Sequence, residues 1–297
     1  MDVSIIIVNY NTKELTYNCL HSVFEQTHSI EFEIIVSDNG STDGSIEMIK
    51  TEFPQVILIE NNANIGFGAA NNRGADIAKG KYLFLLNSDT LLLNNAVKEF
   101  FDYAEKTDGC ILGCFLCDAN GEYINSYGKF NSLKKASFRF LYNYFPFLLR
   151  IRKKMVKKKC VFPETLKVDF VTGADLFLLK KDFTALSGFD ENFFMYYEDS
   201  DLCRRAAKAG IERLLIDTPK IVHLEGRSSK VKAAKLKIME KSFFYYYKKW
   251  ENESGVNLLF FYLFIFLRFF SFQFSLKEKI DMTKNSLLLI KQFFLNK

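Results

Sequence analysis

The chain has 297 residues, the length of one large domain or two small ones, and its hydrophobic content of 48% is enough for a substantial core, which excludes a wholly disordered chain. The net charge of +5 is unevenly spread: ten basic and no acidic residues lie between Lys134 and Cys160, and fourteen basic and five acidic residues lie between Gly226 and Lys297. An acidic body with two basic, aromatic segments indicates an anionic partner surface.

The first ninety residues alternate between apolar strands and helices. Short β-branched runs predict buried strands, and the spacing of the apolar residues between them predicts helices. We expect Thr12 to cap the first helix and Pro54 to end the second. This alternation predicts parallel strands joined by crossover helices in a layered α/β domain. The expected strands are 4–8, 32–37, 56–60 and 82–87, and the expected helices are 12–27, 44–52 and 66–79.

Polar clusters follow three of these expected strands. They are Asn9-Tyr10-Asn11, Asp38-Asn39 and Asn87-Ser88-Asp89. Ligands of open α/β sheets bind beyond the carboxyl ends of the strands. The three clusters therefore predict the position of a binding site.

The pattern becomes mixed after residue 100. We expect strands at 111–117, 168–170 and 176–179, and a last short strand that ends at 221–223. Gly210 stops an expected helix at 200–209. The chain is predicted to be helical from Val231 to its end, and the basic run Arg152–Lys159 is predicted to be a mobile loop.

The six cysteines do not have the pattern of a zinc site. Cys114 and Cys117 make one C-x-x-C pair, with no second pair and no nearby histidine. We expect reduced, partly buried thiols, as in a cytoplasmic protein. The amino-terminal segment enters a strand at once and has no basic region, so we expect no signal peptide.

Seven segments, in order along the chain, resemble the inverting glycosyltransferases of family 2. They are SIIIVNYN, VSDNGSTDGS, NIGFGAANNRG, FLLNSDT, VTGADLFLLKKD, GFDENFFMYYEDSDLCRRAAKAG and VHLEG. The similarity spans residues 3–225 and is greatest to the rhamnosyltransferase-like and galactofuranosyltransferase-like members. It implies the GT-A fold, a Rossmann-like α/β nucleotide-diphospho-sugar transferase domain at 1–228, followed by a basic, aromatic helical extension at 229–297.

The resemblance implies a nucleoside site at the ends of the first two strands. Asp38 would contact the nucleobase, and Tyr10 and Asn11 would lie against the base and ribose. Asp43, close in sequence, is interpreted instead as a helix cap.

The resemblance also implies a divalent metal, Mn²⁺ or Mg²⁺, that bridges the donor diphosphate. Asp89 stands at the last position of the D-x-D-type motif of the family, and His223 would complete the metal site. Asn87 replaces the first acid of the motif, so we expect metal binding to depend more on the diphosphate oxygens. Asn71 lies where many relatives carry an arginine, and with Asn87 it is expected to belong to the donor-binding site. The arginine of this chain is Arg73, which either reaches the diphosphate or has a solvated or structural role.

In the family, the second acid of the pair Glu198-Asp199 deprotonates the acceptor, so the resemblance assigns the catalytic base to Asp199. Glu198 would tune it through like-charge repulsion. Asp201 has the position of a helix-start residue and is predicted to pair with Arg204 or Arg205.

Gly173-Ala174-Asp175 begins an expected strand. Its small residues would let a sugar approach the backbone, and Asp175 would accept hydrogen bonds from the hydroxyls of the donor sugar.

These assignments predict an inverting transfer of a sugar, with rhamnose as the first choice, from a dTDP- or UDP-sugar to a glycan or lipid-linked glycan. One alternative stays open, and a second is disfavoured. Asn87 and the displaced Arg73 leave room for a non-catalytic nucleotide-sugar-binding scaffold protein at the membrane surface. A nucleotidyltransferase would need a Gly-rich basic loop near the amino terminus, and NYNTKEL is not one.

Two segments, 138–152 and 256–274, are rich in aromatic and basic residues. The second is nearly long enough to span a bilayer, but Arg268 interrupts it, which favours a helix that lies on an anionic membrane surface. A helix packed on protein and a true span stay open, as does a homo-oligomer. We therefore expect a cytoplasmic enzyme that is peripheral on the inner face of the cytoplasmic membrane. Nucleic acid is not expected as a partner, because nothing specifies an ordered groove for bases.

Overall fold

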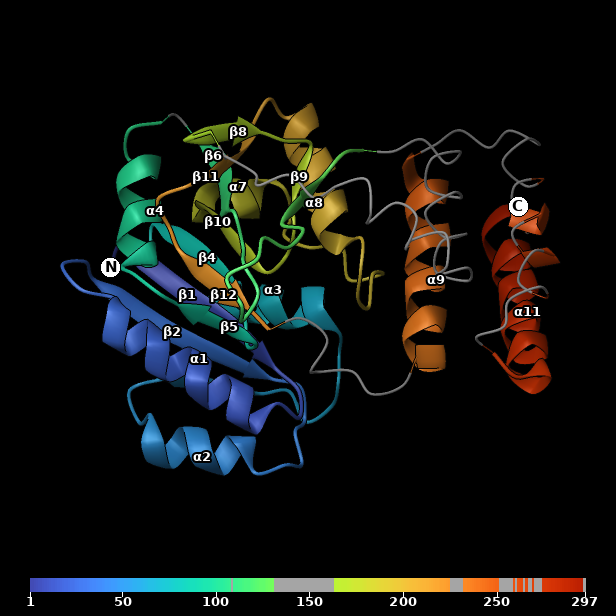
Figure 1. The fold of residues 1–297 in the computed structure, drawn as a ribbon, viewed down its shortest axis with the longest axis horizontal. Helices are drawn as coiled ribbons and strands as arrows, with labels where there is room; N and C mark the ends of the chain where they lie inside the picture. The colour runs from blue at the N-terminus through green and yellow to red at the C-terminus, as the bar shows by residue number, and fades with distance from the viewer. Residues whose placement is uncertain are drawn as a thin grey trace. The chain divides into compact units, whose positions relative to one another are not determined.

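The computed structural model describes residues 1–107, 109–130, 163–224, 232–250, 259, 261–263, 265–266, 269 and 274–295. The chain divides into two compact units, and each is taken by itself. The first contains the described residues up to 224, and the second contains those from 232 onward (Figure 1). The segment 138–152, the predicted loop at 152–159 and most of 256–274 lie outside the described residues.

The first unit is built on a mixed β-sheet, which in the described residues has eight strands in the order β3-β2-β1-β4-β10-β6-β11-β8. Strands β3, β2, β1 and β4 are parallel, whereas β10 runs antiparallel to both β4 and β6. Two smaller pairs, β5 with β12 and β7 with β9, lie outside this sheet. The bounds are β1 Val3–Asn9, β2 Phe32–Asp38, β3 Ile57–Glu60, β4 Tyr82–Asn87, β5 Thr90–Leu92, β6 Cys110–Cys114, β7 Tyr127–Gly128, β8 Thr165–Lys167, β9 Phe170–Val171, β10 Asp175–Leu179, β11 Glu212–Ile216 and β12 Ile221–His223.

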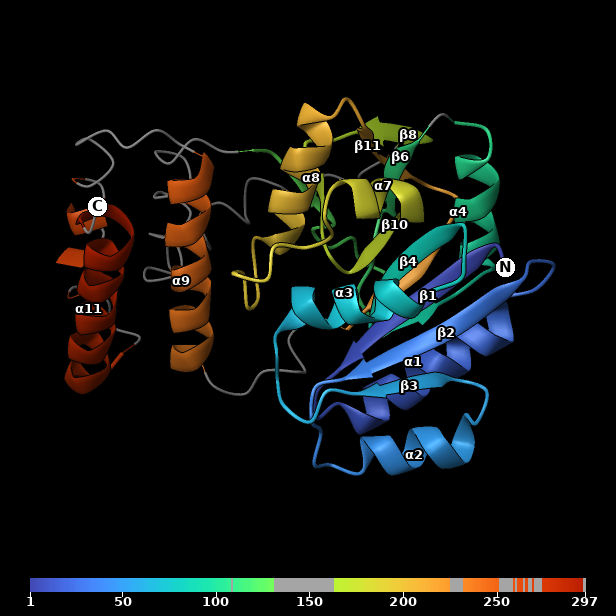
Figure 2. The same ribbon diagram turned by 180° about the vertical axis from the view of Figure 1, so that it is seen from behind.

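Helices cover both faces of the sheet, because alternate side chains of the central strands are apolar on each side. Ile5 and Ile7 of β1 pack with α1, α2 and α4, whereas Ile6 packs with α3, α7 and α8. Figures 1 and 2 show these two helical layers from opposite sides. The bounds are α1 Lys13–Gln26, α2 Ser45–Glu52, α3 Phe67–Ile77, α4 Ala96–Ala104, α7 Lys180–Ala185 and α8 Glu198–Lys208.

The structure confirms the α/β fold class and the strand–helix alternation of the first ninety residues. The expected strand at 111–117 ends at Cys114, because Cys117 forms isolated bridges to Tyr123 and Val222 instead. Thr12 occupies the N-cap position of α1, but its hydroxyl donates to Asn9 and makes no cap bond. Strands β5, β8 and β11 and helices α4 and α7 were not expected from the pattern.

The cysteines of the described residues agree with the prediction of reduced thiols. Cys117 is half-buried, and four others are buried and free: Cys19, Cys110, Cys114 and Cys203. Burial raises the pKa of Cys19 to about 12, so this thiol is inert at neutral pH.

The second unit contains α9 (Lys232–Trp250), α11 (Leu276–Ile290) and the π-helix η1 (Lys291–Leu295). Its core is aromatic, with the rings of Phe244, Phe261 and Phe294 in mutual contact. Among the helices of the described residues, none has the length and low polarity needed to cross a bilayer.

Candidate active site

The ends of β1 and β2 are joined by a buried polar cluster. Asn9 Nδ2 donates to Asp38 Oδ2 at 2.6 Å, and the Ser41 backbone N–H donates to Asp38 Oδ1 at 2.7 Å. Asp38 is fully buried, and each of its oxygens already accepts one hydrogen bond. Each oxygen has room for a second donor by its lone pairs, but the side chain has no exposed surface in this structure.

Two loops above this cluster are tied together by Asn11 and Asp43. Asn11 has a left-handed backbone with φ of 53°, and its Oδ1 accepts from the Thr42 backbone N–H at 2.7 Å. Asp43 accepts from the backbone N–H of Lys13, at the start of α1, at 2.8 Å. This bond is made to α1 rather than to α2, the helix that Asp43 was expected to cap, whose N-cap residue is Gly44 and has no side-chain cap bond. Tyr10 follows the last residue of β1. Its side chain is 46% exposed, so its ring faces solvent.

The Asn71 and Arg73 side chains both make hydrogen bonds within the domain. Asn71 is buried, and its Nδ2 donates to the Phe67 carbonyl within α3. Arg73 donates to Asn61 Oδ1 at 2.8 Å, and Asn61 in turn donates to Asn39 at 2.9 Å. Arg73 itself is exposed, so this bond links an exposed arginine of α3 to Asn61, the residue that follows β3.

The β4 end lies beside the β1 end, and a hydroxyl pair connects them. Thr12 Oγ1 lies 3.2 Å from Ser88 Oγ. Beyond Ser88, Asp89 Oδ1 lies 3.1 Å from His223 Nε2, and Asn87 Nδ2 lies 3.4 Å from the same nitrogen. The antiparallel pairing of β5 with β12 brings these residues together, since it places His223 opposite Thr90. The three side chains expected at the metal site therefore form one group.

The pair of Asp89 and His223 fits a divalent cation that also has diphosphate ligands. Two ligand atoms at about 2.1 Å from an octahedral ion and at right angles are about 3 Å apart, and the two facing atoms here are separated by 3.1 Å. Within the described residues, no three His, Cys, Asp or Glu side chains gather closely enough to hold a metal. The remaining ligands would be oxygens from substrate and water, as is usual for Mg²⁺.

Gly173 and Ala174 connect this group to the acidic pair. The Asn87 backbone N–H donates to the Ala174 carbonyl at 3.0 Å. The Gly173 N–H donates to Asp199 Oδ2 at 3.1 Å. A continuous path of contacts thus links Asp199 to Asn87, although 112 positions separate them in the sequence.

Asp175 is fully buried at the start of β10. Its Oδ2 accepts from the Cys114 backbone N–H at 2.6 Å, and its Oδ1 has no hydrogen-bond partner among the described residues. Burial raises the pKa of Asp175 to about 7, while the Cys114 bond and the nearby His223 oppose the rise.

A strained turn presents the acidic pair. Tyr196 and Tyr197 have φ of 69° and 71°, a left-handed conformation that costs roughly 1–2 kcal/mol per residue for side chains of this kind. The preceding loop is pinned to α3, whose Phe67 N–H donates to the Phe194 carbonyl at 2.9 Å. Glycine is required at Gly66, because a Cβ there would collide with the same carbonyl.

Glu198 and Asp199 have different environments. Glu198 is buried, and Oε2 has no partner among the described residues. Burial, followed by the charge of Asp199, raises the pKa of Glu198 well above its ordinary value. Asp199 instead accepts from the backbone N–H groups of Ser200 and Gly173, at 2.6 and 3.1 Å. Hydrogen bonds from backbone N–H groups favour the ionised form of a carboxylate such as Asp199.

Asp201 has a structural environment, as predicted. It is fully buried, and Arg205 Nε donates to its Oδ2 at 2.8 Å. Arg204, the other predicted partner, lies over the Phe130 ring at 5.7 Å.

Sequence reasoning missed one residue beside the acidic pair. The Phe67 ring lies against Gly173, where an added Cβ would be 3.3 Å from Phe67 Cε1 and 3.7 Å from Asp199 Cβ. Phe67 follows Gly66 in the segment NIGFGAANNRG, but nothing in that segment indicates a contact with a residue more than a hundred positions away.

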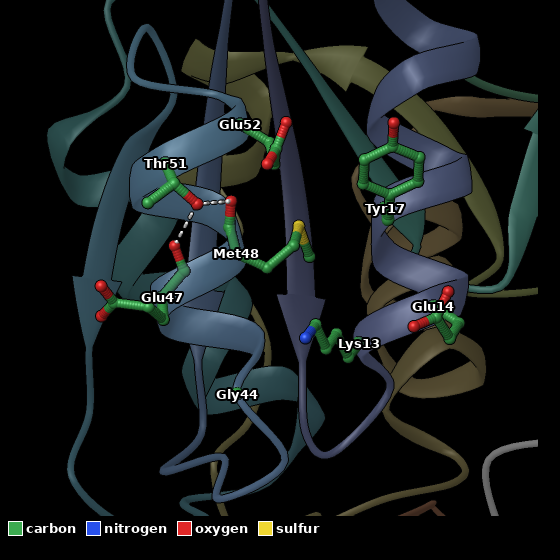
Figure 3. Close-up of a pocket in the computed structure, with 8 residues that line it drawn as sticks. All are labelled: Lys13, Glu14, Tyr17, Gly44, Glu47, Met48, Thr51 and Glu52. Atoms are coloured by element: carbon green, nitrogen blue, oxygen red, sulfur yellow. Dashed lines mark hydrogen bonds between the residues drawn. The ribbon is translucent and has the colours of Figure 1, made fainter.

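The surface also has a cavity of about 630 Å³ between α1 and α2 (Figure 3). It contains none of the strand-end residues described above. Three of its side chains are glutamates and one is a lysine, a balance that disfavours an anionic diphosphate. We therefore assign the candidate site to the strand ends. The cavity is lined by Lys13, Glu14, Tyr17, Gly44, Glu47, Met48, Thr51 and Glu52.

The fold and this site define a glycosyltransferase of the GT-A type. The family model described as glycosyl transferase family 2 matches residues 4–163, and the chain belongs to that family. One similar relative is the N-acetylglucosaminyl-diphospho-decaprenol L-rhamnosyltransferase of Mycobacterium tuberculosis, which is 26% identical over 212 residues, 66% of this chain and 67% of the relative. Another is rhamnosyltransferase WbbL of Escherichia coli, 27% identical over 218 residues, 70% of this chain and 78% of the relative.

A solved structure supports the fold at low sequence identity. The structure of TarS residues 1–349 from S. aureus in complex with UDP-GlcNAc superposes with a TM-score of 0.58 and 15% identity, covering 99% of this chain and 82% of that one. Together these comparisons confirm the resemblance to family 2 and to its rhamnosyltransferase-like members.

Proposed function

We propose that this glycosyltransferase transfers a sugar, with rhamnose as the first candidate, from a nucleoside-diphosphate donor to a lipid-linked glycan with inversion at the anomeric carbon. The observation that carries the proposal is the path of contacts from Asp199 through Gly173 and Ala174 to Asn87, Asp89 and His223. It supports a base and a diphosphate site on opposite sides of one reacting centre.

In this mechanism Asp199 is the catalytic base. The acceptor oxygen attacks the anomeric carbon, Asp199 takes the hydroxyl proton, and the bond to the diphosphate breaks with its electron pair on the leaving oxygen. Burial and the charge of Asp199 raise the pKa of Glu198, which favours the neutral form of Glu198 beside an ionised Asp199. The Gly173 N–H holds the carboxylate in place.

The donor would lie across the strand ends, with its nucleoside at Tyr10, Asn11 and Asp38. Asp89 and His223 would hold a divalent cation, Mn²⁺ or Mg²⁺, which when bound supplies positive charge for the departing diphosphate. The sugar would lie over Gly173 and Ala174, where small side chains leave room beside Asp199. A uridine or thymidine donor is consistent with the UDP-GlcNAc complex of the structural neighbour.

The acceptor and location follow from the relatives. The mycobacterial relative is a rhamnosyltransferase of an N-acetylglucosaminyl-diphospho-decaprenol. A similar polyprenyl-linked acceptor would be presented at the inner face of the cytoplasmic membrane, and we propose that the chain works there. Residues 1–228 would form the transferase domain, and 229–297 the extension that serves the membrane.

The test combines a donor screen with product analysis. Thermal stabilisation by a panel of nucleotide sugars, with and without Mn²⁺, identifies the donor. The anomeric configuration of the product then reports the stereochemistry by NMR. Retention of configuration, or stabilisation by every donor without turnover of any, would overturn the proposal.

A further inference from the structure

The helix α11 has an exposed apolar row that the described residues of its unit do not cover. Leu276, Ile280 and Leu287 are 67, 40 and 43% exposed. At 3.6 residues per turn, these three side chains lie within about 40° of one another around the helix axis. Large apolar side chains rarely gather in this way on a surface that faces only water.

The opposite side of α11 already makes the internal packing of the second unit. Met282, Ser286 and Leu289 are buried there, and Ser286 Oγ donates to Glu240 Oε1 of α9 at 2.5 Å. The exposed row is therefore not needed for attachment of α11 to α9.

A row of lysines runs beside the apolar row. Lys277, Lys284 and Lys291 are exposed and recur every seven residues, which places them within about 40° of one another and about 60° from the apolar row. The two acids of this helix lie elsewhere. Glu278 caps the helix through Ser275, and Asp281 lies about 40° beyond the lysines.

We propose that this face of α11 is a membrane-binding surface that lies on anionic lipid. The three apolar side chains would enter the acyl region, and the three lysines would extend to the lipid phosphates. Two copies of this face brought together in antiparallel orientation would set lysine row near lysine row, which disfavours such a dimer. The choice of a lipid surface rests on the proposed function, because a lipid-linked acceptor would be presented there.

The test uses the full chain and vesicles of phosphatidylcholine, alone or mixed with phosphatidylglycerol, in co-sedimentation without donor or acceptor. We expect binding to the anionic vesicles that weakens in high salt. The variant K277Q/K284Q/K291Q should bind about a hundredfold more weakly, since each lysine near an anionic surface contributes about fivefold. The variant L276S/I280S/L287S keeps the charge of the chain, and at the same salt concentration its affinity for the anionic vesicles should fall at least tenfold.

A matched control removes three exposed lysines from the first unit, K79Q/K106Q/K181Q. This control should retain binding, and circular dichroism should show that every variant is folded. Wild-type chain that ignores anionic vesicles, or a control that loses as much as the α11 variants, would overturn the proposal. So would apolar variants that change a monomer–dimer equilibrium and leave vesicle binding intact.

Vesicle binding and catalysis are read separately. The α11 variants should keep their turnover with a water-soluble acceptor, because no residue of α11 belongs to the proposed site. A chain that binds vesicles but transfers no sugar would contradict the proposed function and would still support α11 as a membrane-binding surface.

Discussion

Replacement of Asp199 by asparagine tests the proposed base with little change in size. The two oxygens of Asp199 accept from Ser200 N at 2.6 Å and from Gly173 N at 3.1 Å. An asparagine has one acceptor oxygen, which would keep the shorter bond to Ser200. Its amide nitrogen would then face the Gly173 N–H, so one bond to a charged group is lost, a cost of about 1.5–3 kcal/mol.

The effect on catalysis should be larger than this structural cost. A positioned general base contributes about 10²–10⁴-fold in rate, equivalent to about 3–5 kcal/mol of the barrier. We expect kcat of Asp199→Asn to fall by that factor. Nucleoside-diphosphate affinity should change by less than about threefold, because Asp89 and His223 keep their positions, and a group acting only in the transition state leaves ground-state binding unchanged.

The release of nucleoside diphosphate gives kcat, and titration calorimetry gives the affinity for the nucleoside diphosphate. Asp201→Asn is the matched control, because it is the same substitution two positions away on α8. A kcat for Asp199→Asn within tenfold of the wild-type value refutes the assignment of the base. An equal loss of donor affinity would also refute it, since Asp199 would then be part of the donor site.

Three further predictions concern stability, pH and metal. Asp201→Asn should lower the free energy of unfolding in urea by about 3 kcal/mol, because it leaves Arg205 without its buried carboxylate, and an unchanged midpoint would contradict this. Asp175 has its pKa raised to about 7, so the folded chain keeps a proton that the unfolded chain releases near pH 4. The ionisation of Asp175 therefore does not affect the free energy of unfolding below pH 4. Between pH 4 and 7 it lowers that free energy progressively, and above pH 7 the loss is constant, on the order of 4 kcal/mol. Asp175→Asn should remove this slope, and parallel stability curves for variant and wild type would disprove it. His223→Asn and Asp89→Asn should each raise by at least tenfold the Mn²⁺ concentration needed for half of the thermal stabilisation by a nucleoside diphosphate. Equal Mn²⁺ requirements in variants and wild type would remove the pair from metal binding.

The pattern of apolar residues was sufficient to predict the strands and helices of the first ninety residues. Ile5, Ile6 and Ile7 form a continuous apolar run because β1 is covered on both faces, and this local signal predicted a buried parallel strand. Strand β11 was missed because it is only five residues long and opens with Glu212 and Arg213. Such a short strand forms because its neighbours β6 and β8 pair with it, and pairing is not encoded within the segment itself.

The sequence by itself determined that polar side chains lie at the strand ends. A buried strand has apolar residues along its length, so acids such as Asp38 and Asp89 occur at its end or just after it. It also determined, through similarity to family 2, that the chain is a glycosyltransferase. Only the tertiary structure decided how these groups interact. Arg73 donates to Asn61, and Glu198 is buried whereas Asp199 accepts from two backbone N–H groups. On α11, lysines and apolar side chains are exposed beside each other. The physical reason is that periodicity along a chain specifies which side of an element is apolar, whereas burial, pKa and hydrogen bonding depend on which distant segment packs against it.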